Sequence, residues 1–245
     1  MIYKNVAQNV ALVTFAKDVD HVNFENRQKW LVKEIRKTGI FKHVIDYTQN
    51  NWFKHTDLYK QEAEIFKNNV RGYGYWSWKP HTIQHTFDNY EDVDVVIYID
   101  VNLIIKKLAK MVQKILGKLY ENDGIWLHDN GAWQNKAWTK RDAFILMDMD
   151  YERYWNSPHV YATYVAFHRN STVAMDLLKD WCKYSCDMRI IGDDKSKLGT
   201  ELPELCAHRH DQSILSLLAE KYKVKLDKIG IREFYKKGWA KTCIN

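Results

Sequence analysis

Residues 71–102, RGYGYWSWKPHTIQHTFDNYEDVDVVIYIDVN, decide how this chain folds. The stretch begins with glycines and aromatic residues, continues past Pro80, and ends in the apolar run 93–100. A continuous apolar run is typical of a strand that is buried on both faces of a parallel sheet. Proline suits the first turn of a helix because the N–H that it lacks has no partner there. The stretch therefore predicts a turn, a short helix over residues 80–87 and a core strand.

Similar apolar runs alternate with amphipathic segments along the rest of the chain. Predicted strands cover residues 10–16, 43–47, 93–100, 124–128 and 161–168. Predicted helices cover residues 24–39, 55–69, 80–87, 106–120, 171–185 and 211–224. This alternation predicts an α/β fold with a mostly parallel sheet flanked by helices. No internal repeat or linker interrupts it, so we expect residues 1–245 to form a single domain.

Three of these helices carry further signals. The helix 24–39 should end at Gly39 and place Trp30, Leu31 and Ile35 on one face. The helix 106–120 should bury one apolar face made of Leu108, Met111, Val112, Ile115 and Leu119, with lysines on its other face. A serine or threonine cap should open the helix 171–185.

The composition narrows the class of protein. The 245 residues are 46% hydrophobic and 28% charged, which is typical of a globular chain. The net charge of +6 favours acidic partners mildly, but no basic run resembles a nucleic-acid-binding arm, so we expect no nucleic-acid partner. The 10 tryptophans and 15 tyrosines fill a core or line a cleft that stacks on a ligand.

The expected location is the cytoplasm. Residues 1–9 are polar, unlike a signal peptide, and no apolar stretch approaches the roughly 18 residues of a membrane span. The four cysteines, Cys182, Cys186, Cys206 and Cys243, are expected to be reduced thiols. A zinc site is the alternative, because CAHRH at residues 206–210 follows the first two cysteines, although this spacing is not that of a zinc finger.

Asp100 and Asn102 stand where the central predicted strand ends. In open α/β sheets, ligands bind outside the carboxyl ends of the strands. An Asp-x-Asn pair offers hard oxygen ligands, which suit Mg²⁺ or Mn²⁺ bridging a diphosphate. The alternative is that Asp100 merely caps the following turn.

The segment GYGYWSWKP, residues 72–80, precedes this strand. Its two glycines permit a sharp turn or a close approach of the backbone to a ligand. Trp76 and Trp78 can stack on a base or a sugar, and Lys79 can bind a phosphate at the start of a helix. Alternatively, the tryptophans anchor the next helix to the core.

Two polar segments lie later in the chain. In HRHDQS, residues 208–213, Asp211 is placed to accept a proton from a hydroxyl or to hold a sugar hydroxyl. The alternative is that Asp211 caps the helix while Arg209 pairs with Glu201 or Glu204. The segment 129–144, DNGAWQNKAWTKRDAF, offers indoles, amides and charges that suit a sugar, or else forms a solvated loop.

Four ordered motifs, GYGYWSWKP, VVIYID, WTKRDAF and HRHDQSILSLL, resemble those of GT-A-type glycosyltransferases from bacterial and large-virus glycan gene sets. The resemblance spans residues 10–224. It implies a Rossmann-like nucleotide-sugar-binding half over about residues 1–102 and an acceptor-binding half over about residues 103–245. The implied reaction moves a hexosyl or pentosyl group from a nucleotide-diphosphate donor to a hydroxyl of a glycan, lipid-linked or protein acceptor.

The resemblance also implies roles for individual residues. The metal motif falls on Asp100 and Asn102, where the neutral Asn102 departs from the usual second aspartate, and Mn²⁺ or Mg²⁺ is the implied cofactor. Asp211 and His210 are the implied catalytic residues. The implied donor-binding residues are Thr14, Arg71, Tyr75, Trp76, Trp78, Lys79 and Asp100. The implied acceptor-binding residues are Asp129, Trp138, Lys140, Arg141, Asp142 and His208.

Other readings of the chain are an enzyme of another class or a binding protein. A sugar-nucleotide pyrophosphorylase would need a glycine-rich loop after the first strand, and residues 15–24 contain no glycine. A non-catalytic glycan-binding or membrane-surface protein is the main alternative, because the lysine face of the helix 106–120 suits peripheral contact with a membrane. The basic, aromatic tail at residues 234–242 is expected to fold over the diphosphate as a lid, or else to fray.

Overall fold

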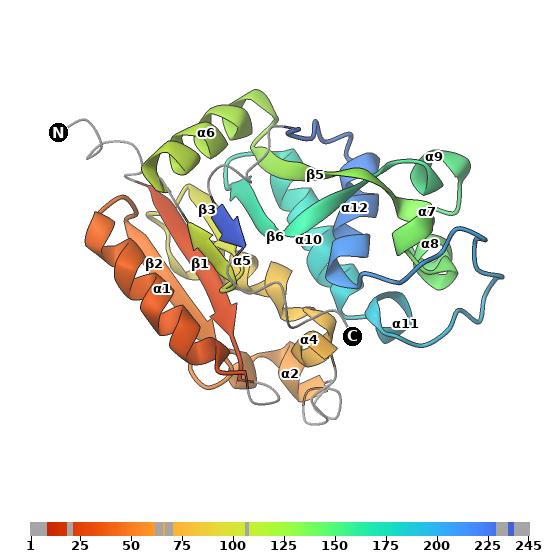
Figure 1. Ribbon diagram of the computed structural model, residues 1–245, viewed down its shortest axis with the longest axis horizontal. Helices are drawn as coiled ribbons and strands as arrows, with labels where there is room; N and C mark the ends of the chain where they lie inside the picture. The colour runs from red at the N-terminus through yellow and green to blue at the C-terminus, as the bar shows by residue number, and fades with distance from the viewer. Residues whose placement is uncertain are drawn as a thin grey trace.

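A five-stranded sheet forms the centre of the protein, in a computed structural model that describes residues 9–18, 22–61, 66, 71–105, 108–228 and 235–237 (Figure 1). The strand order is β2-β1-β3-β6-β5. The strands are β1 (Val10–Ala16), β2 (His43–Thr48), β3 (Val95–Ile99), β5 (Ile125–Gln134) and β6 (Pro158–His168). β1 pairs parallel with β2 and β3, whereas β6 pairs antiparallel with β3 and β5. Only β6 therefore runs against the other strands, which confirms the predicted α/β class with a mostly parallel sheet.

Helices cover both faces of this sheet. The longer ones are α1 (Phe24–Thr38), α5 (Trp78–Asn89), α6 (Leu108–Glu121), α10 (Thr172–Ser185) and α12 (Asp211–Lys221). Short ones are η1 (Phe53–His55), α2 (Asp57–Gln61), α4 (Arg71–Tyr75), α7 (Asn135–Trp138), α8 (Arg141–Leu146), α9 (Glu152–Trp155) and α11 (Met188–Ile191). Side chains of α1 and α6 pack in one core cluster, and those of α5, α10 and α12 pack in the other. None of the described helices is long and apolar enough to cross a membrane.

The strand residues divide between these two clusters because successive side chains of a strand point to opposite faces. In β1, Val10 and Leu12 belong to the cluster of α1 and α6, whereas Ala11, Val13 and Phe15 belong to the other. Every β1 residue is buried, as the continuous apolar run predicts.

The predicted helix signals hold with one exception. Gly39 ends α1 in the left-handed conformation with φ of 63°, Ser171 caps α10, and the five apolar residues expected inside α6 are all buried. The exception is Trp30, which is 54% exposed, while Val32 joins Leu31 and Ile35 in the core. Trp30, Leu31 and Val32 are adjacent apolar residues, so the sequence alone does not tell which of them is buried.

The order of the strands creates a switch point between β1 and β3. The chain leaves β1 through α1 towards β2 on one side, and later enters β3 on the other side of β1. In open α/β sheets, ligands bind at the carboxyl ends of the strands at such a point. Lys17 directly follows β1 here, and Asp100 directly follows β3.

A two-stranded sheet lies outside the main one. It pairs β4 (Leu103–Ile105) antiparallel with β7 (Tyr235–Lys237), so the backbone after β3 lies beside a piece of the C-terminal tail. The remaining residues of the predicted lid, 234 and 238–242, lie outside the described residues.

Candidate active site

Three charged side chains from distant parts of the chain meet at the end of β3. The ammonium of Lys79, in the first turn of α5, lies 2.9 Å from Asp211 Oδ2 and 3.6 Å from Asp100 Oδ1. Lys79 and Asp211 are almost fully buried, whereas the side chain of Asp100 is 22% exposed. Asp100 is therefore the member of this charged cluster that reaches solvent.

The burial of the charged cluster changes its proton affinities. Burial raises the pKa of Asp211 to about 6, although the neighbouring charge of Lys79 acts in the opposite direction. Burial disfavours the ammonium of Lys79, but Asp100 and Asp211 outweigh this effect and raise the pKa of Lys79. The lysine therefore stays charged, and Asp211 changes its protonation close to neutral pH.

Tyr98 fixes the position of Asp100. Its hydroxyl donates a hydrogen bond of 2.7 Å to Asp100 Oδ1. Tyr98 and Asp100 are two positions apart at the end of a strand, so the alternation of the strand places both on the same side. Burial raises the pKa of Tyr98 well above its usual value, which keeps its hydroxyl a hydrogen-bond donor.

A left-handed turn leads into Lys79. The five residues from Gly72 to Trp76 all have positive φ, between 53° and 82°. A Cβ atom on Gly72 would lie 2.4 Å from the ring of Trp76, and one on Gly74 would lie 1.9 Å from the ring of Phe66. Both glycines are thus required by conformation and by space, as the predicted sharp turn demands. Tyr75 and Trp76 tolerate the same conformation at a cost, and such strain concentrates at functional sites.

His210 is held beside this turn. Its ring stacks on Tyr75 with centroids 4.9 Å apart, and it lies 5.6 Å from the ring of Trp76. His210 Nδ1 hydrogen-bonds the carbonyl oxygen of Ile191 at 2.8 Å, and burial lowers the pKa of His210 to about 4. The ring is therefore neutral at pH 7, and Nδ1 carries the proton.

The start of α12 differs in detail from the expected cap. His210 is the N-cap residue, with φ of 54°, and it makes no side-chain capping bond, while Asp211 is the first helical residue. The alternative pairing of Arg209 with Glu201 or Glu204 is wrong, because Glu204 pairs with Lys136 and Glu201 accepts from backbone N–H groups. The carboxylate of Asp211 pairs with Lys79 and also accepts from the backbone N–H of Gln212.

Two further cations lie at the switch point. Arg27, in the first turns of α1, donates from Nη1 to Asn102 Oδ1 at 3.0 Å. Lys17 Nζ lies 5.7 Å from the ring centroid of Tyr73 and donates to the carbonyl oxygen of Asp18. The carboxyl ends of β1 and β3 thus carry Lys17, Asp100 and Asn102, and Arg27 of α1 contacts Asn102.

Asp100 and Asn102 are the predicted metal ligands, and their surroundings do not fit a divalent cation. The oxygen Oδ1 of Asp100 accepts from Tyr98 and faces the ammonium of Lys79, and the amide oxygen of Asn102 accepts from Arg27. A Mg²⁺ ion needs several free oxygen ligands at about 2.1 Å and would stand close to two cationic side chains here. Within the described ranges, no group of three or more histidine, cysteine or carboxylate side chains is arranged to hold a metal ion.

The predicted donor residues occupy three different environments. Thr14 is fully buried, and its carbonyl oxygen accepts from Gln28. Trp78 is 5% exposed, stacks on Phe15 at 4.0 Å, and donates its indole N–H to the carbonyl oxygen of Gly72, as the core-anchor alternative expects. Tyr75 and Trp76 contact His210, and Arg71 is exposed at the start of the turn. Their contact with a donor stays a prediction.

Part of the predicted acceptor set lies beside the start of α12. The ring of Trp138 stacks on Trp133 with centroids 4.0 Å apart, and the guanidinium of Arg209 lies 4.7 Å from the Trp138 ring. The backbone carbonyl of Trp138 accepts from Arg209 N and Ser213 Oγ. His208 is half-buried and accepts from the backbone N–H of Lys140, which ties the start of α8 to the residues before α12.

Lys140, Arg141 and Asp142, the other predicted acceptor-binding residues near α8, make contacts within the protein, most of them with the loop 192–198. Lys140 donates to the carbonyl oxygens of Gly192 and Asp194. The carboxylate of Asp142 accepts from the backbone N–H groups of residues 197 and 198. Arg141 pairs with Asp150 at 2.9 Å. These contacts organise residues 192–198, and acceptor binding by Lys140, Arg141 and Asp142 stays a prediction.

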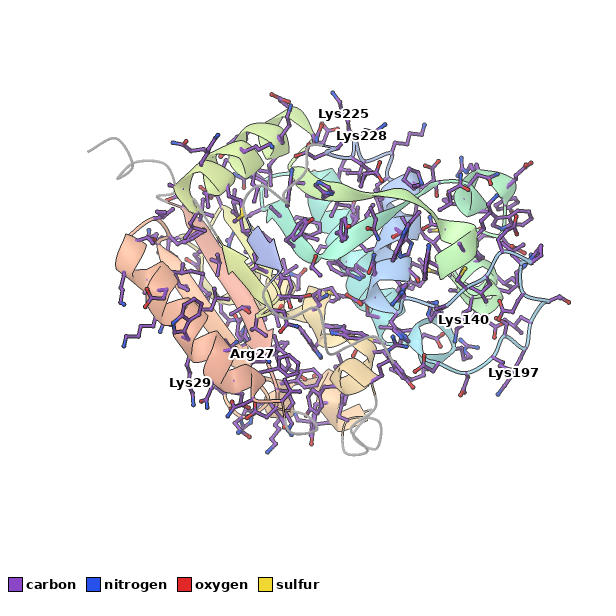
Figure 2. All side chains as sticks on the ribbon, viewed as in Figure 1. Arg27, Lys29, Lys140, Lys197, Lys225 and Lys228 are labelled. Carbon is purple, nitrogen blue, oxygen red and sulfur yellow. The ribbon has the colours of Figure 1, made fainter. Side chains whose placement is uncertain are left out.

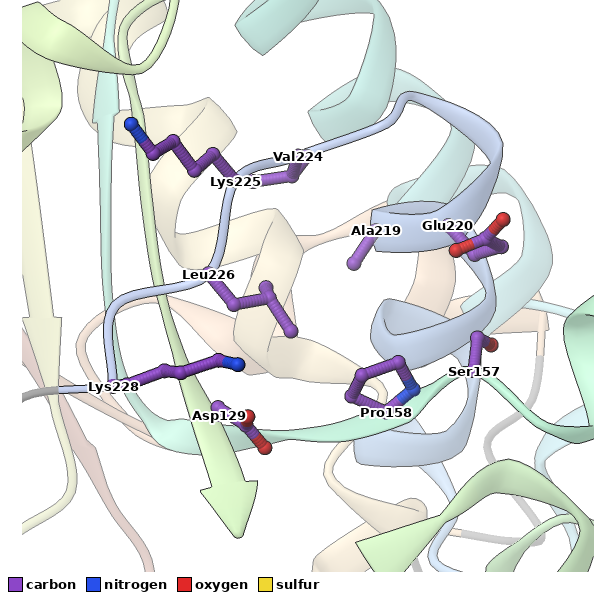
Figure 3. Close-up of a pocket in the computed structure, with 9 residues that line it drawn as sticks. All are labelled: Asp129, Ser157, Pro158, Ala219, Glu220, Val224, Lys225, Leu226 and Lys228. Atoms are coloured by element: carbon purple, nitrogen blue, oxygen red, sulfur yellow. The ribbon is translucent and has the colours of Figure 1, made fainter.

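Asp129 lies in a separate cavity of about 470 Å³ at the other end of α12 (Figure 3). Ala219 and Glu220 line the same cavity, and they come two turns or more after Asp211. Because a helix rises about 1.5 Å per residue, the cavity lies on the order of 12 Å along α12 from the charged cluster. The structure therefore does not bring Asp129 together with Asp100 and Asp211.

The cysteines give no support to the zinc alternative. Cys182, Cys186 and Cys206 form no disulfide bond with one another, and burial raises the pKa of Cys182. Cys206 is exposed, while Cys186 Sγ lies 3.5 Å from His81. Cys243 lies outside the described residues.

Sequence reasoning did not single out Lys17, Arg27, Tyr98 or Trp133. Tyr98 had a local signal, since alternation along β3 places it on the side of Asp100. Arg27 had none, because Asn102 is 75 residues away in the chain.

Comparisons with known proteins concern the fold alone. No protein family and no curated protein matches the chain. A solved glycosyltransferase involved in the glycosylation of the major capsid of PBCV-1 aligns with a TM-score of 0.40 and 9% identity, over 72% of this chain and 66% of that one, just under two thirds of its length. Mouse xyloside xylosyltransferase 1, in its apo form, aligns with a TM-score of 0.43 and 11% identity, over 92% of this chain and 85% of that one. At these values the alignments carry no argument about activity, and the function has to be inferred from the site.

Proposed function

We propose that this protein is a glycosyltransferase that moves a sugar from a nucleotide-diphosphate donor to an acceptor hydroxyl. The supporting observation is the charged cluster of Asp100, Lys79 and Asp211 at the switch point of the sheet. A nucleotide-sugar would lie across the carboxyl ends of β1 and β3, where ligands of open α/β sheets bind. A glycan, lipid-linked or protein acceptor would approach from the side of Trp138 and Arg209.

The charged cluster would serve as the proton sink of the transfer. Two carboxylates and one ammonium leave a formal charge of −1, so the cluster can take up one proton from the acceptor hydroxyl. Asp100 is its exposed member, and Asp211, with a pKa of about 6, is the buried member, which is mostly ionised at pH 7 and can take up a proton. Because Asp211 is buried, we propose that the proton enters at Asp100 and that Lys79 passes one of its protons to Asp211 while it takes the one from Asp100.

His210 would position the site rather than exchange protons. Its pKa of about 4 leaves it neutral, and its contacts with Tyr75 and Trp76 hold the left-handed turn against the start of α12. Lys79 comes three residues after Trp76, and Asp211 directly follows His210, so we propose that the packing of His210 helps to set the separation of Lys79 and Asp211. The catalytic role implied for His210 would thus act through Asp211.

A thermal-shift panel of nucleoside diphosphates tests the donor site. A nucleotide at a hundred times its dissociation constant should stabilise the fold by about 2.7 kcal/mol. We expect a shift with one nucleotide in wild type, in Asp100→Ala and in Glu152→Ala, an exposed residue of α9, because Asp100 is proposed as a proton acceptor and not as a donor contact; turnover should be lost in Asp100→Ala alone. A sugar-release assay with the matching nucleotide-sugar then measures turnover.

The competing function is a glycan-binding protein without catalysis. Such a protein would be stabilised by free glycans and by no nucleotide. That result would refute the transferase proposal.

A further inference from the structure

Two cationic side chains, Arg27 and Lys79, lie against the oxygens of the predicted metal ligands. Arg27 occupies the amide oxygen of Asn102 at 3.0 Å, and Lys79 faces Asp100 at 3.6 Å. A metal ion bound to Asn102 Oδ1 at about 2.1 Å would lie within about 5 Å of the Arg27 guanidinium. The two positive groups would repel each other at that separation.

The same positions suit a diphosphate. A guanidinium binds phosphate oxygens through two parallel N–H groups, and it is always charged. The guanidinium of Arg27 is restrained on one side by the ring of Phe24, at 5.2 Å, and on another by Asn102, so it loses little freedom when it binds an anion.

Lys17 provides a second charge on the neighbouring strand end. It directly follows β1, and its ammonium lies over the ring of Tyr73 at 5.7 Å. The diphosphate of a nucleotide-sugar carries two negative charges, and one arginine and one lysine supply the same number of positive charges. A divalent cation supplies the same two charges in enzymes that use a metal.

We propose that Arg27 and Lys17 bind the donor diphosphate in place of a divalent cation, with Asn102 as the residue that positions Arg27. This inference rests on the proposed transferase function. Asn102 then has a reason to be neutral: an aspartate there would form an ion pair with Arg27 and compete with the diphosphate for it. The asparagine in place of the second aspartate and its hydrogen bond with Arg27 thus have the same explanation.

The test measures binding of UDP, GDP, CDP, ADP and TDP by calorimetry, each in EDTA and in MnCl₂. We expect one of them to bind with the same dissociation constant in both buffers. Arg27→Ala and Lys17→Ala should each weaken its binding about tenfold, and Arg27→Lys should recover part of the loss. Lys29→Ala, which removes an equal charge from an exposed position of α1, should leave binding unchanged (Figure 2).

Three results would overturn the inference. Binding that requires Mn²⁺ would leave the transferase in place and assign a metal to the site. Metal-independent binding that is equally strong in Arg27→Ala and Lys29→Ala would show that Arg27 does not hold the diphosphate. Absence of binding for all five nucleotides in both buffers would refute the transferase function, and the inference with it.

A second readout is independent of nucleotides. Electron paramagnetic resonance of free Mn²⁺ measures metal uptake by the protein alone. Wild type should take up no Mn²⁺ at millimolar concentration, whereas Arg27→Ala/Asn102→Asp, which removes the cation and restores a second carboxylate, should gain a site that Arg27→Ala alone lacks. Stoichiometric uptake by wild type, lost in Asp100→Ala, would overturn the inference.

Discussion

Replacing Lys79 by methionine is the sharpest test of the charged cluster. The change keeps the length of the side chain and removes the ammonium that lies 2.9 Å from Asp211 and 3.6 Å from Asp100. Breaking a buried ion pair by removing one partner costs about 3–5 kcal/mol, because the remaining charge stays buried without compensation. For a domain of this size, each kcal/mol lowers Tm by about 2–4 °C, so Tm should fall by about 6–20 °C.

The pH dependence of this loss has a definite sign. Lys79 lowers the pKa of Asp211, so its removal raises that pKa further above the ordinary value of the carboxyl group. The folded variant then binds a proton that the unfolded chain releases, and its stability increases as the pH falls towards the unfolded pKa. The difference in Tm between wild type and Lys79→Met should therefore shrink on acidification.

A double-mutant cycle supplies the assay and its control. Lys79→Met/Asp211→Asn removes both buried charges and should regain more than half of the stability lost by Lys79→Met, measured by urea unfolding at pH 7. Lys29→Met, at an exposed position of α1, should change stability by less than about 0.5 kcal/mol. Additive losses in the cycle, or a Lys79→Met deficit that is constant with pH, would refute the reasoning.

Three further predictions follow from other parts of the site. Gly74→Ala should lower the free energy of unfolding by about 2 kcal/mol or more, because φ is +82° and the new Cβ would meet the ring of Phe66. Gly117→Ala in α6, where a Cβ has open space, should instead raise it by about 0.5–1 kcal/mol. Equal unfolding free energies of the two variants would contradict this reasoning. Since the pKa of Asp211 is about 6, kcat/KM for sugar transfer should fall as the pH decreases through about 6, and a flat profile between about pH 5 and 7 would exclude Asp211 from the proton transfer. Trp138→Ala should raise KM for the acceptor while the donor dissociation constant measured by calorimetry stays the same; a parallel rise of both would place Trp138 in the donor site.

Much of the fold could be predicted because it depends on local pattern. The first strand occupies Val10–Ala16 as the apolar run predicts, and α1 ends at Gly39 because only glycine takes the left-handed conformation without strain. The period of the apolar residues in α6 likewise identifies its buried face. These features depend on residues within a few turns of one another.

The candidate site could be predicted only in part. The motifs around Lys79, Asp100 and Asp211 were recognised separately, as residues of the right chemistry at helix starts and a strand end. Their meeting around one ammonium could not be foreseen, because it depends on how α5 and α12 pack on the sheet. Trp78 shows the opposite error: its aromatic ring suggests ligand stacking, but the packing against Phe15 places it in the core.

The sequence by itself thus determined the elements, the α/β class and the chemical types of the candidate residues, since each follows from propensity and periodicity along the chain. Only the tertiary structure decided which charges share one environment. It buries Lys79 between Asp100 and Asp211, raises the pKa of Asp211, and brings Arg27 to Asn102 across 75 residues. The physical reason is that desolvation and Coulomb interaction depend on distances in space, and the order of the strands sets those distances.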